Sequence, residues 1–262
     1  MERIKIFTRS FDLKLYSYSR ALYEGLGIPV VRLTDQSADG YFFTMLKDEE
    51  CDIAINIDED AFLVDPDAMM ELVDYVVANG YANAGCPDGG TDAVPRGGNP
   101  KVTNPFFNVF NLAMIRRKFD KNQLHRRLDD CEPYYPFFLW MAENFKILYL
   151  PAEKHADGIT TVLKDLQDRT ICVHSWFARF YSMPSFMVKF AQKDKDNQKG
   201  RIDSLIHEAY AARGMELPVF GFSDRISFVL NKVVRWAIKV PQRISRWPYK
   251  IKRKLRLLLS SR

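Results

Sequence analysis

Cysteine is scarce in this chain and scattered along it. The 262 residues include four cysteines, Cys51, Cys86, Cys131 and Cys172. No two of them form a CxxC pair or another spacing typical of zinc ligands, so the sequence offers no cysteine-based metal site. Isolated cysteines are typical of buried thiols in a reducing compartment, and we expect the protein to be cytoplasmic.

Long apolar runs are also lacking. No segment approaches the ~20 consecutive apolar residues that a helix needs to cross a bilayer. The segment Met1–Arg9 is too short and too charged to supply the apolar region of a secretory signal peptide. Apolar residues still make up 47% of the chain and aromatic residues 13%, which is enough for a substantial core and excludes general disorder.

Acidic residues are missing from the end of the sequence. Residues 225–262 contain twelve Lys and Arg residues and no Asp or Glu, whereas the whole chain has 38 basic and 33 acidic residues. The net charge of +5 therefore combines an acidic body with a basic tail. We expect one large domain over residues 1–224 and a tail over residues 225–262.

Strand-like and helix-like segments alternate along the body of the chain. Strands are expected at Arg3–Thr8, Ile28–Leu33, Ile53–Ile57, Tyr81–Cys86, Phe145–Leu150 and Thr170–Phe177, and a strand that passes into a helix at Asn108–Ile115. Helices are expected from Leu15 to Leu26, from Tyr41 to Leu46, over Pro66–Val77 and Tyr134–Asn144, and through Met215. This alternation predicts an α/β fold.

The most informative segment is Cys51–Leu63, in which a short apolar run ends in three acidic residues. The run is nearly continuous in apolar side chains, which is typical of a strand buried in a parallel sheet. Asp58, Glu59 and Asp60 follow it directly. Parallel sheets bind ligands beyond the carboxyl ends of their strands, and alternate side chains share a face, so Asp58 and Asp60 can reach one metal ion while Glu59 points away. The alternative is a polar turn without a ligand.

Three motifs in a fixed order resemble those of a known family. They are Asn56–Phe62 with its DxD sequence, the aromatic segment Glu132–Pro151, and Val173–Trp176. Together they resemble glycosyltransferases of the GT-A fold, particularly bacterial enzymes that build surface polysaccharide or lipopolysaccharide. The resemblance covers residues 1–181. It implies a Rossmann-like, mixed and mainly parallel sheet flanked by helices. It also implies hexosyltransferase-like transfer from a UDP- or GDP-linked sugar to a glycan or lipid-linked acceptor.

The resemblance implies a divalent metal ion at the DxD motif. Asp60 is then the main metal ligand, Asp58 contacts the metal or the donor ribose, and His174 completes the protein ligands. Carboxylate and phosphate oxygens suit Mg²⁺ or Mn²⁺, and an imidazole ligand favours Mn²⁺. His155 is the alternative histidine ligand, and a buried structural role is the alternative for His174.

Residues for the nucleotide are implied at the ends of the first two strands. In the family the end of the first strand holds the base and ribose, which corresponds here to Thr8, Arg9 and Ser10. Asp35, after the second strand, is a further candidate. For Arg9 an ordinary surface position is the alternative.

The irregular segment Asp88–Pro105 is rich in Gly, Pro and Asn, as functional loops and lids often are. Asp88 and Gly89 lie where the family contacts the donor sugar, since glycine permits a close backbone approach. Arg96 or Lys101 on this loop is a candidate contact to the diphosphate, with a solvated loop charge as the alternative.

The catalytic base of an inverting transfer must deprotonate the acceptor hydroxyl. The resemblance places it at Glu132, with Asp130 and Asp129 as substitutes. The family pattern is a paired Glu-Asp, whereas Glu132 is followed by Pro133. Both the base and the anomeric outcome therefore stay open, and acidic residues that cap the next helix are the alternative.

The basic tail mixes Lys and Arg with aromatic and aliphatic residues. This composition is typical of a segment that lies on an anionic membrane surface, and we expect peripheral binding to the inner face of the cell membrane. The candidate contacts are Trp236, Arg243, Trp247, Lys250, Lys252, Arg253 and Lys254. Nucleic acid is the competing partner, but the acidic body argues against it.

Two other functions compete with sugar transfer. A sugar-phosphate nucleotidyltransferase shares the α/β fold and the metal carboxylates, but it is disfavoured because Thr8–Asp12 contains no glycine. A non-enzymatic membrane- or nucleic-acid-binding module is the other alternative, with an incidental acidic turn.

Overall fold

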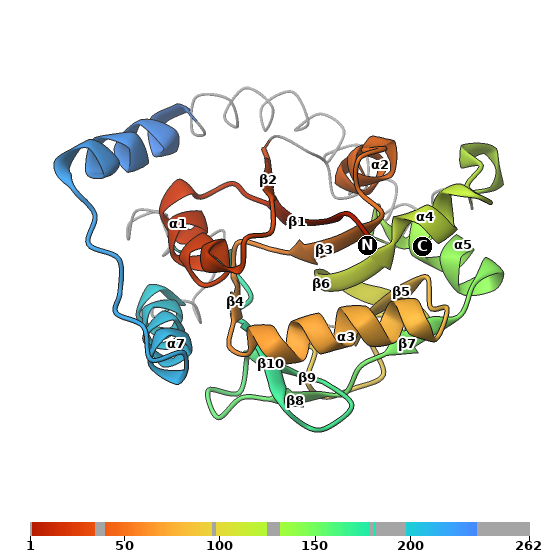
Figure 1. The fold of residues 1–262 in the computed structure, drawn as a ribbon. Coiled ribbons are helices and arrows are strands. Elements are labelled where there is room, and N and C mark those ends of the chain that lie inside the picture. The colour runs from red at the N-terminus through yellow and green to blue at the C-terminus, as the bar shows by residue number, and fades with distance from the viewer. Residues whose placement is uncertain are drawn as a thin grey trace, which may run out of the picture. The chain divides into compact units, whose positions relative to one another are not determined.

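The computed structural model describes residues 2–34, 40–95, 98–124, 132–178, 181 and 198–234. Backbone contacts divide the chain into two compact units, Met1–Pro218 and Val219–Arg262. The first unit contains two β-sheets with helices around them (Figure 1). The second unit begins at Val219, a few residues before the tail boundary expected at Arg225.

The central sheet of the first unit is mixed and mainly parallel, so the predicted fold class is confirmed. β6 runs antiparallel to β3 and β5, and the other neighbouring strands are parallel. As a result, the carboxyl ends of β1, β2, β3 and β5 lie at the edge of the sheet where β6 begins. The strand order is β2 (Val30–Leu33), β1 (Ile4–Arg9), β3 (Ile53–Ile57), β6 (Thr103–Asn111), β5 (Asn83–Pro87) and β7 (Ile147–Tyr149).

A second, smaller sheet is antiparallel throughout. Its order is β4 (Ala61–Leu63), β10 (Thr170–His174), β9 (Thr161–Lys164) and β8 (Ala152–Lys154). β10 lies within a predicted strand, whereas β4, β8 and β9 are not predicted. Because β3 ends at Ile57 and β4 starts at Ala61, the three acidic residues connect the two sheets.

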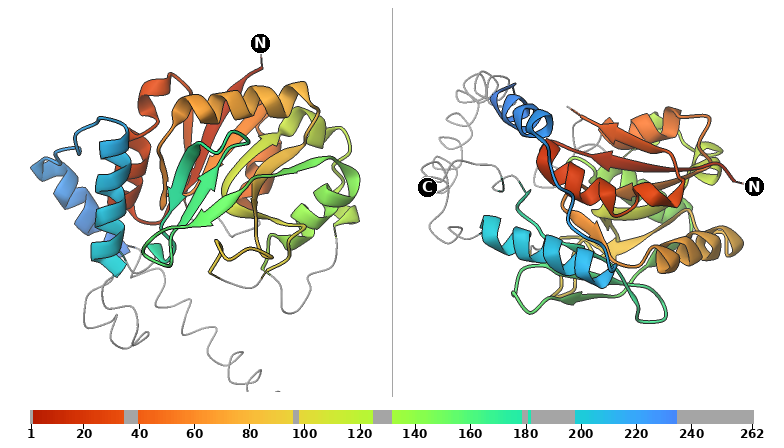
Figure 2. Two further views of the ribbon diagram at one scale, coloured as in Figure 1. Left: turned by 90° about the horizontal axis from the view of Figure 1, so that it is seen from below. Right: turned by 60° about the vertical axis from the view of Figure 1, so that its left-hand side comes forward.

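Helices cover both faces of the central sheet. Alternate residues of β1 belong to different clusters, with Ile6 on one face and Phe7 on the other. Figure 2 shows α2 and α3 on opposite sides of this sheet. The Ile6 face packs against α1 (Leu13–Ala21), α3 (Pro66–Ala78), α7 (Gln198–Ala212) and the small sheet, and the Phe7 face against α2 (Gly40–Lys47), α4 (Leu112–Arg116) and α5 (Tyr135–Asn144). Short 3-10 turns are η1 (Glu24–Leu26) and η2 (Lys121–Gln123).

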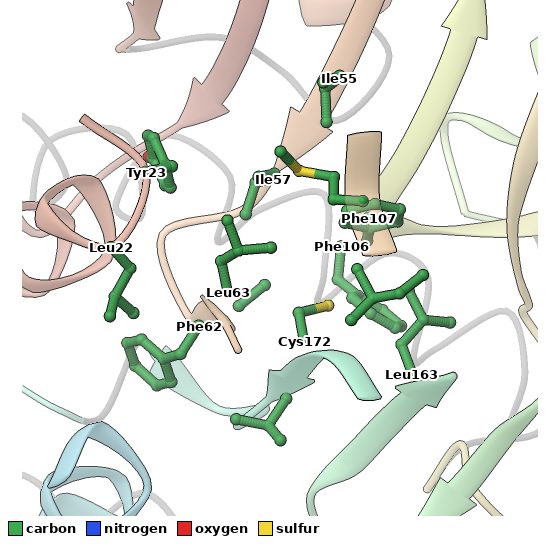
Figure 3. Packing of buried hydrophobic residues seen from close by; sticks show 14 of the residues in the cluster. Leu22, Tyr23, Ile55, Ile57, Phe62, Leu63, Phe106, Phe107, Leu163 and Cys172 are labelled. Carbon is green, nitrogen blue, oxygen red and sulfur yellow. The ribbon is translucent and has the colours of Figure 1, made fainter. Parts of the chain in front are cut away.

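The core between the two sheets holds the acidic turn in place. Figure 3 shows side chains of β3, β4, β9 and β10 packed together, among them Ile57, Phe62 and Leu163. Phe62 and Leu163 are fully buried, and full burial of one such side chain contributes about 1.5–3 kcal/mol. The residues between β3 and β4 are therefore anchored at both ends by apolar packing.

Local sequence explains the starts of the helices near this core. Asp12 caps α1 by accepting hydrogen bonds from the backbone N–H groups of Lys14 and Leu15. Asp65 caps α3 in the same way, and Pro66 occupies the first turn as the sequence predicts.

The described cysteines Cys51, Cys86 and Cys172 are buried free thiols, as expected. Among the described residues, none of the helices has the length and apolarity needed to cross a membrane.

Candidate functional site

The acidic turn lies at the edge of the central sheet and is held by backbone hydrogen bonds on both sides. The N–H of Asp58 donates to the carbonyl of Phe106 at the start of β6, at 2.9 Å. The N–H of Ser175, just after β10, donates to the carbonyl of Asp60, also at 2.9 Å. Asp58, Glu59 and Asp60 are all buried. Three carboxyl groups are thus concentrated where parallel-sheet proteins bind their ligands.

Asp58 is a buried carboxylate, and one of its two oxygens lacks a hydrogen-bond partner among the described residues. One oxygen faces a guanidinium nitrogen of Arg9 at 3.3 Å, and the other, Oδ1, has no hydrogen-bond partner among the described residues. Burial raises the pKa of Asp58 to about 6, against the opposing effect of Arg9. A buried oxygen without a donor is costly, so this atom is available to a ligand.

Asp60 and His174 face each other across the small sheet. The residue opposite His174 in the β4–β10 pairing is Ala61, which brings His174 Nε2 to 3.4 Å from Asp60 Oδ1. Burial opposes ionisation of Asp60, but His174 and Arg9 outweigh it, and the pKa of Asp60 is lowered.

Aromatic rings fix the imidazole of His174. It stacks on Phe106 with ring centroids 4.4 Å apart, and Trp176 packs on it at the same distance. His174 Nδ1 is buried and has no hydrogen-bond partner among the described residues. The alternative histidine, His155, instead faces Glu208 of α7 at 3.2 Å, and its contacts do not reach the acidic turn.

Glu59 stabilises the loop that follows β1. Its carboxylate accepts hydrogen bonds from Ser10 Oγ at 3.0 Å and from the N–H groups of Phe11 and Asp12 at 2.8 and 2.7 Å. Burial raises the pKa of Glu59 to about 8. Glu59 therefore orders the chain beside the site, and its partners differ from those of Asp58.

The residues at the end of β1 have different surroundings. Thr8 is fully buried, and its hydroxyl is 2.7 Å from the hydroxyl of Tyr23. Ser10 contacts Glu59 and accepts a hydrogen bond from Arg32 at 3.1 Å. Arg9 is therefore the member of the predicted set that faces Asp58.

Arg9 is held between aromatic rings. Its guanidinium lies 5.1 Å from the ring of Tyr41 and 5.8 Å from the ring of Phe11. The Tyr41 hydroxyl is buried without a hydrogen-bond partner among the described residues. Sequence reasoning missed Tyr41, because an aromatic residue in an apolar helix has no local signal that separates it from the core.

Asn56 was also missed, although its position carries a signal. It lies in β3, two residues before Asp58, which follows the end of that strand. Its side-chain nitrogen donates to the carbonyl of Pro105, and its Oδ1 is buried without a hydrogen-bond partner among the described residues. Asn56 therefore joins Asp58, His174 and Tyr41 as a buried group with an open polar atom.

Asp88 lies at the same edge of the sheet, beyond β6. It is fully buried and accepts hydrogen bonds from the hydroxyls of Tyr134 and Tyr135, at 3.0 and 2.7 Å, and from the side chain of Asn104. These contacts tie the end of β5 to the start of α5. These bonds give Asp88 an architectural role, and its contact to the donor sugar stays a prediction.

Close packing within the same loop explains why position 89 is a glycine. A side chain at Gly89 would collide with the backbone of Gly98, so the close approach that glycine permits is to the loop itself. Lys101 is exposed at the end of this loop.

The segment after His174 is strained and tied to α7. Trp176 and Phe177 both have φ of 59°, in the left-handed region that residues other than glycine rarely adopt. Arg201 donates to the carbonyl of Ser175 at 2.5 Å and to Asp157 at 3.1 Å. This helix therefore stabilises the backbone next to the imidazole.

Glu132 is exposed and lies directly before α5. Its carbonyl accepts a hydrogen bond from the N–H of Tyr135 at 3.0 Å, which places it next to the Asp88 cluster. Several predicted site residues lie outside the described residues: Asp35, Arg96, Asp129, Asp130, Trp236, Arg243, Trp247, Lys250, Lys252, Arg253 and Lys254.

A divalent metal fits two of these carboxylates. Among the described residues, no three His, Cys, Asp or Glu side chains form a ready-made metal site. Mg²⁺ and Mn²⁺, however, are often held by one or two carboxylates while phosphate oxygens and water complete the shell. The open Oδ1 of Asp58 and the neighbouring Asp60 supply that minimum. Arg9 and His174 compensate the same carboxylates in this structure.

No protein-family model matches the chain, and no curated protein matches it. Solved structures with a similar backbone include a cytidylyltransferase from Leptospira borgpetersenii, with 11% identity, a TM-score of 0.41, and coverage of 84% of this chain and 100% of the other. The mannosyltransferase PcManGT from Pyrobaculum calidifontis, in complex with GDP-Man and Mn²⁺, has 8% identity and a TM-score of 0.41, covering 93% and 82%. S. aureus TarS 1-349 has 12% identity and a TM-score of 0.38, covering 79% and 71%. Similarities of this size do not assign a function.

Proposed function

We propose that the protein is a metal-dependent GT-A glycosyltransferase that acts in the synthesis of surface polysaccharide or lipopolysaccharide. It moves a sugar from a UDP- or GDP-linked donor to a glycan or lipid-linked acceptor. The observation that carries the proposal is the pair of buried aspartates, Asp58 and Asp60, just beyond the carboxyl end of β3 in the central sheet. The open oxygen of Asp58 and the neighbouring cation Arg9 support it.

The site contains both carboxylates and a guanidinium group that could act on the donor diphosphate. Asp58 and Asp60 would hold Mg²⁺ or Mn²⁺, which supplies Lewis-acid stabilisation to the departing nucleoside diphosphate. Arg9 presents a planar, permanently charged fork that suits phosphate oxygens. When phosphate binds, Arg9 can exchange its long 3.3 Å contact with Asp58 for shorter bonds to the ligand.

His174 is held as a rigid neighbour of Asp60. The imidazole stacks on Phe106 and has a tilted contact with Trp176, and these two rings restrict its rotation, so either nitrogen keeps a fixed direction. Nε2 orients the carboxylate of Asp60, and the open Nδ1 is available to a ligand. In this proposal His174 serves the metal site through Asp60 or as a direct ligand.

The acceptor hydroxyl needs a base, and Glu132 is our candidate. It is exposed at the start of α5, where Tyr134 and Tyr135 are anchored to Asp88. An exposed carboxylate on an anchored segment can accept a proton without a large desolvation cost. Asp130 remains the substitute.

The test is hydrolysis of UDP- and GDP-sugars with Mn²⁺, comparing the wild type with Asp60→Ala. We expect the substitution to reduce turnover at least ~100-fold, since the developing diphosphate charge loses its main stabilisation. Asp168→Ala, at an exposed aspartate of the same unit, is the matched control and should keep full activity.

Thermal melting with UDP or GDP completes the test. The wild type should be stabilised by nucleotide only when the metal is present, and Asp60→Ala should not. An unchanged rate in Asp60→Ala would refute the metal assignment. Release of pyrophosphate from a nucleoside triphosphate and a sugar 1-phosphate, without donor hydrolysis, would identify a nucleotidyltransferase instead.

For its location, we propose that residues 1–224 form the catalytic domain and that the basic tail over residues 225–262 holds it at the inner face of the cell membrane. The support is the composition of residues 225–262, which contain twelve Lys and Arg residues and no Asp or Glu.

A further inference from the structure

The helix over residues 222–234 exposes a continuous set of large apolar side chains. These are Phe222, Ile226, Val229, Leu230 and Val233, which we call the apolar face. Phe222 is 81% exposed and Val229 is 59% exposed. Val219 and Val234 are exposed just before and at the end of this segment. Elsewhere in the described chain, Tyr75, Tyr149 and Leu166 are exposed at separate places, and isolated exposed apolar residues are ordinary on protein surfaces.

The spacing of these residues places them together. They follow one another at intervals of four, three, one and three, which is the pattern of one side of an α-helix. Arg225 and Lys232 fall on other sides of the helix. Phe228 also lies elsewhere, because it is buried and its ring packs against that of Phe220 at 5.0 Å. The helix thus has one side with an internal contact and another with exposed apolar groups.

The amino-acid composition from residue 225 onward favours one kind of partner for the apolar face. From residue 225 to the end the chain has twelve Lys and Arg residues and no acidic residue. A second copy of this segment would bring positive charges together and is disfavoured by repulsion. A nucleic acid would satisfy the cations but would leave Phe222 and its neighbours in water. A bilayer with anionic lipids satisfies both, because head groups attract the cations and acyl chains accept the apolar side chains.

We propose that the apolar face inserts into the interfacial layer of an anionic membrane, with the helix lying along the surface. The first residue that enters the bilayer is then Phe222, ahead of the basic tail predicted to start at Arg225. Insertion adds a contribution that salt does not screen, unlike the attraction of the twelve cations. The inference rests on the membrane location proposed above and is independent of the proposed sugar transfer.

The experiment measures co-sedimentation of the full chain with vesicles of phosphatidylcholine, with or without phosphatidylglycerol. The test variant carries Ile226→Gln, Val229→Gln and Val233→Gln, which leave the charge unchanged and keep helix propensity at least as high. The control variant carries Ser223→Gln, Arg225→Lys and Lys232→Arg on the same helix, and it also keeps the charge.

We expect partitioning onto anionic vesicles to fall at least ~10-fold in the test variant and less than ~2-fold in the control. In high salt the wild type should keep part of its binding and the test variant should lose it. Equal binding of both variants would overturn insertion in favour of surface charge alone. Self-association of the wild type in size-exclusion chromatography, lost in the test variant without vesicle binding, would overturn it in favour of a second copy.

Discussion

Glu59 and its neighbour Asp58 show how adjacent carboxylates divide between fold and site. Glu59 accepts three hydrogen bonds from residues 10–12, so its burial is compensated by the protein. Asp58 has one long ion pair and an oxygen without a protein partner. A buried group left unsatisfied costs about 1–3 kcal/mol. The fold sustains that cost at Asp58, and this is why Asp58 is our candidate for binding a ligand.

The contribution of Asp165 to the stability of the fold should depend on pH. It lies between β9 and β10 and accepts hydrogen bonds from the N–H groups of Gln167 and Arg169 and from the Arg169 side chain. Burial opposes its ionisation, but these bonds outweigh it and hold the pKa of Asp165 below its usual range. Its stabilising contribution is therefore present above the unfolded-state pKa and is lost as the pH falls through the lowered native pKa.

We expect Asp165→Asn to lower the free energy of unfolding by about 1–3 kcal/mol near neutral pH. The difference from the wild type should shrink in acid, below about pH 4. Urea unfolding at neutral and acidic pH measures it. Asp168→Asn, at the exposed neighbour, is the control with little effect at either pH. A difference that does not vary with pH would contradict the assignment.

At the scale of elements, periodicity predicts the long segments and misses the short ones. The buried strand β3 and the Pro66 helix follow from local sequence, because their apolar patterns extend over several residues. β4 and β8 have three residues each, too few to show an alternation. They exist because β10 and β9 pair with them, and such contacts between distant residues leave no local pattern.

The contact between α7 and the strained segment after β10 is testable at this scale. Arg201 is largely buried and bonds to Asp157, Thr160 and the carbonyl of Ser175. Arg201→Met should lower the free energy of unfolding by about 3 kcal/mol, because it leaves Asp157 without its cation and the carbonyl without a donor.

Denaturant unfolding measures the loss, and Lys199→Met on the same helix is the control. Lys199 is exposed and pairs with Asp203 four residues away, a contact worth at most about 0.5 kcal/mol. Equal losses of unfolding free energy in the two variants would show that Arg201 does not stabilise the strained segment after β10.

At the scale of the whole molecule, the division at Pro218 leads to a prediction about a truncated chain. Both sheets and both apolar clusters lie before this residue, and the helix with the apolar face lies after it. A chain that ends at Pro218 should melt at nearly the temperature of the full chain and keep hydrolysis of soluble donor. It should lose binding to anionic vesicles. Loss of melting cooperativity or of hydrolysis would contradict this independence.

The candidate site is only partly predictable from the sequence. The placement of Asp58, Asp60 and His174 follows from the order of motifs in the GT-A resemblance, since pairing of β4 with β10 is not readable from local pattern. Tyr41 contacts Arg9 and Arg201 contacts the backbone after His174, both from distant helices, so these contacts depend on tertiary packing. The roles of Asp35, Asp130 and the tail residues stay predictions.

The acidic turn has one more consequence, which concerns insertions and deletions. Its three residues span the gap between a strand of one sheet and a strand of the other, and both strands are locked in register. One residue more or less would reverse the sides of β4, so that Phe62 would exchange places with Ala61 and Leu63. The interval between the two aspartates is therefore set by the architecture as well as by the chemistry, and homologous chains should vary in length elsewhere.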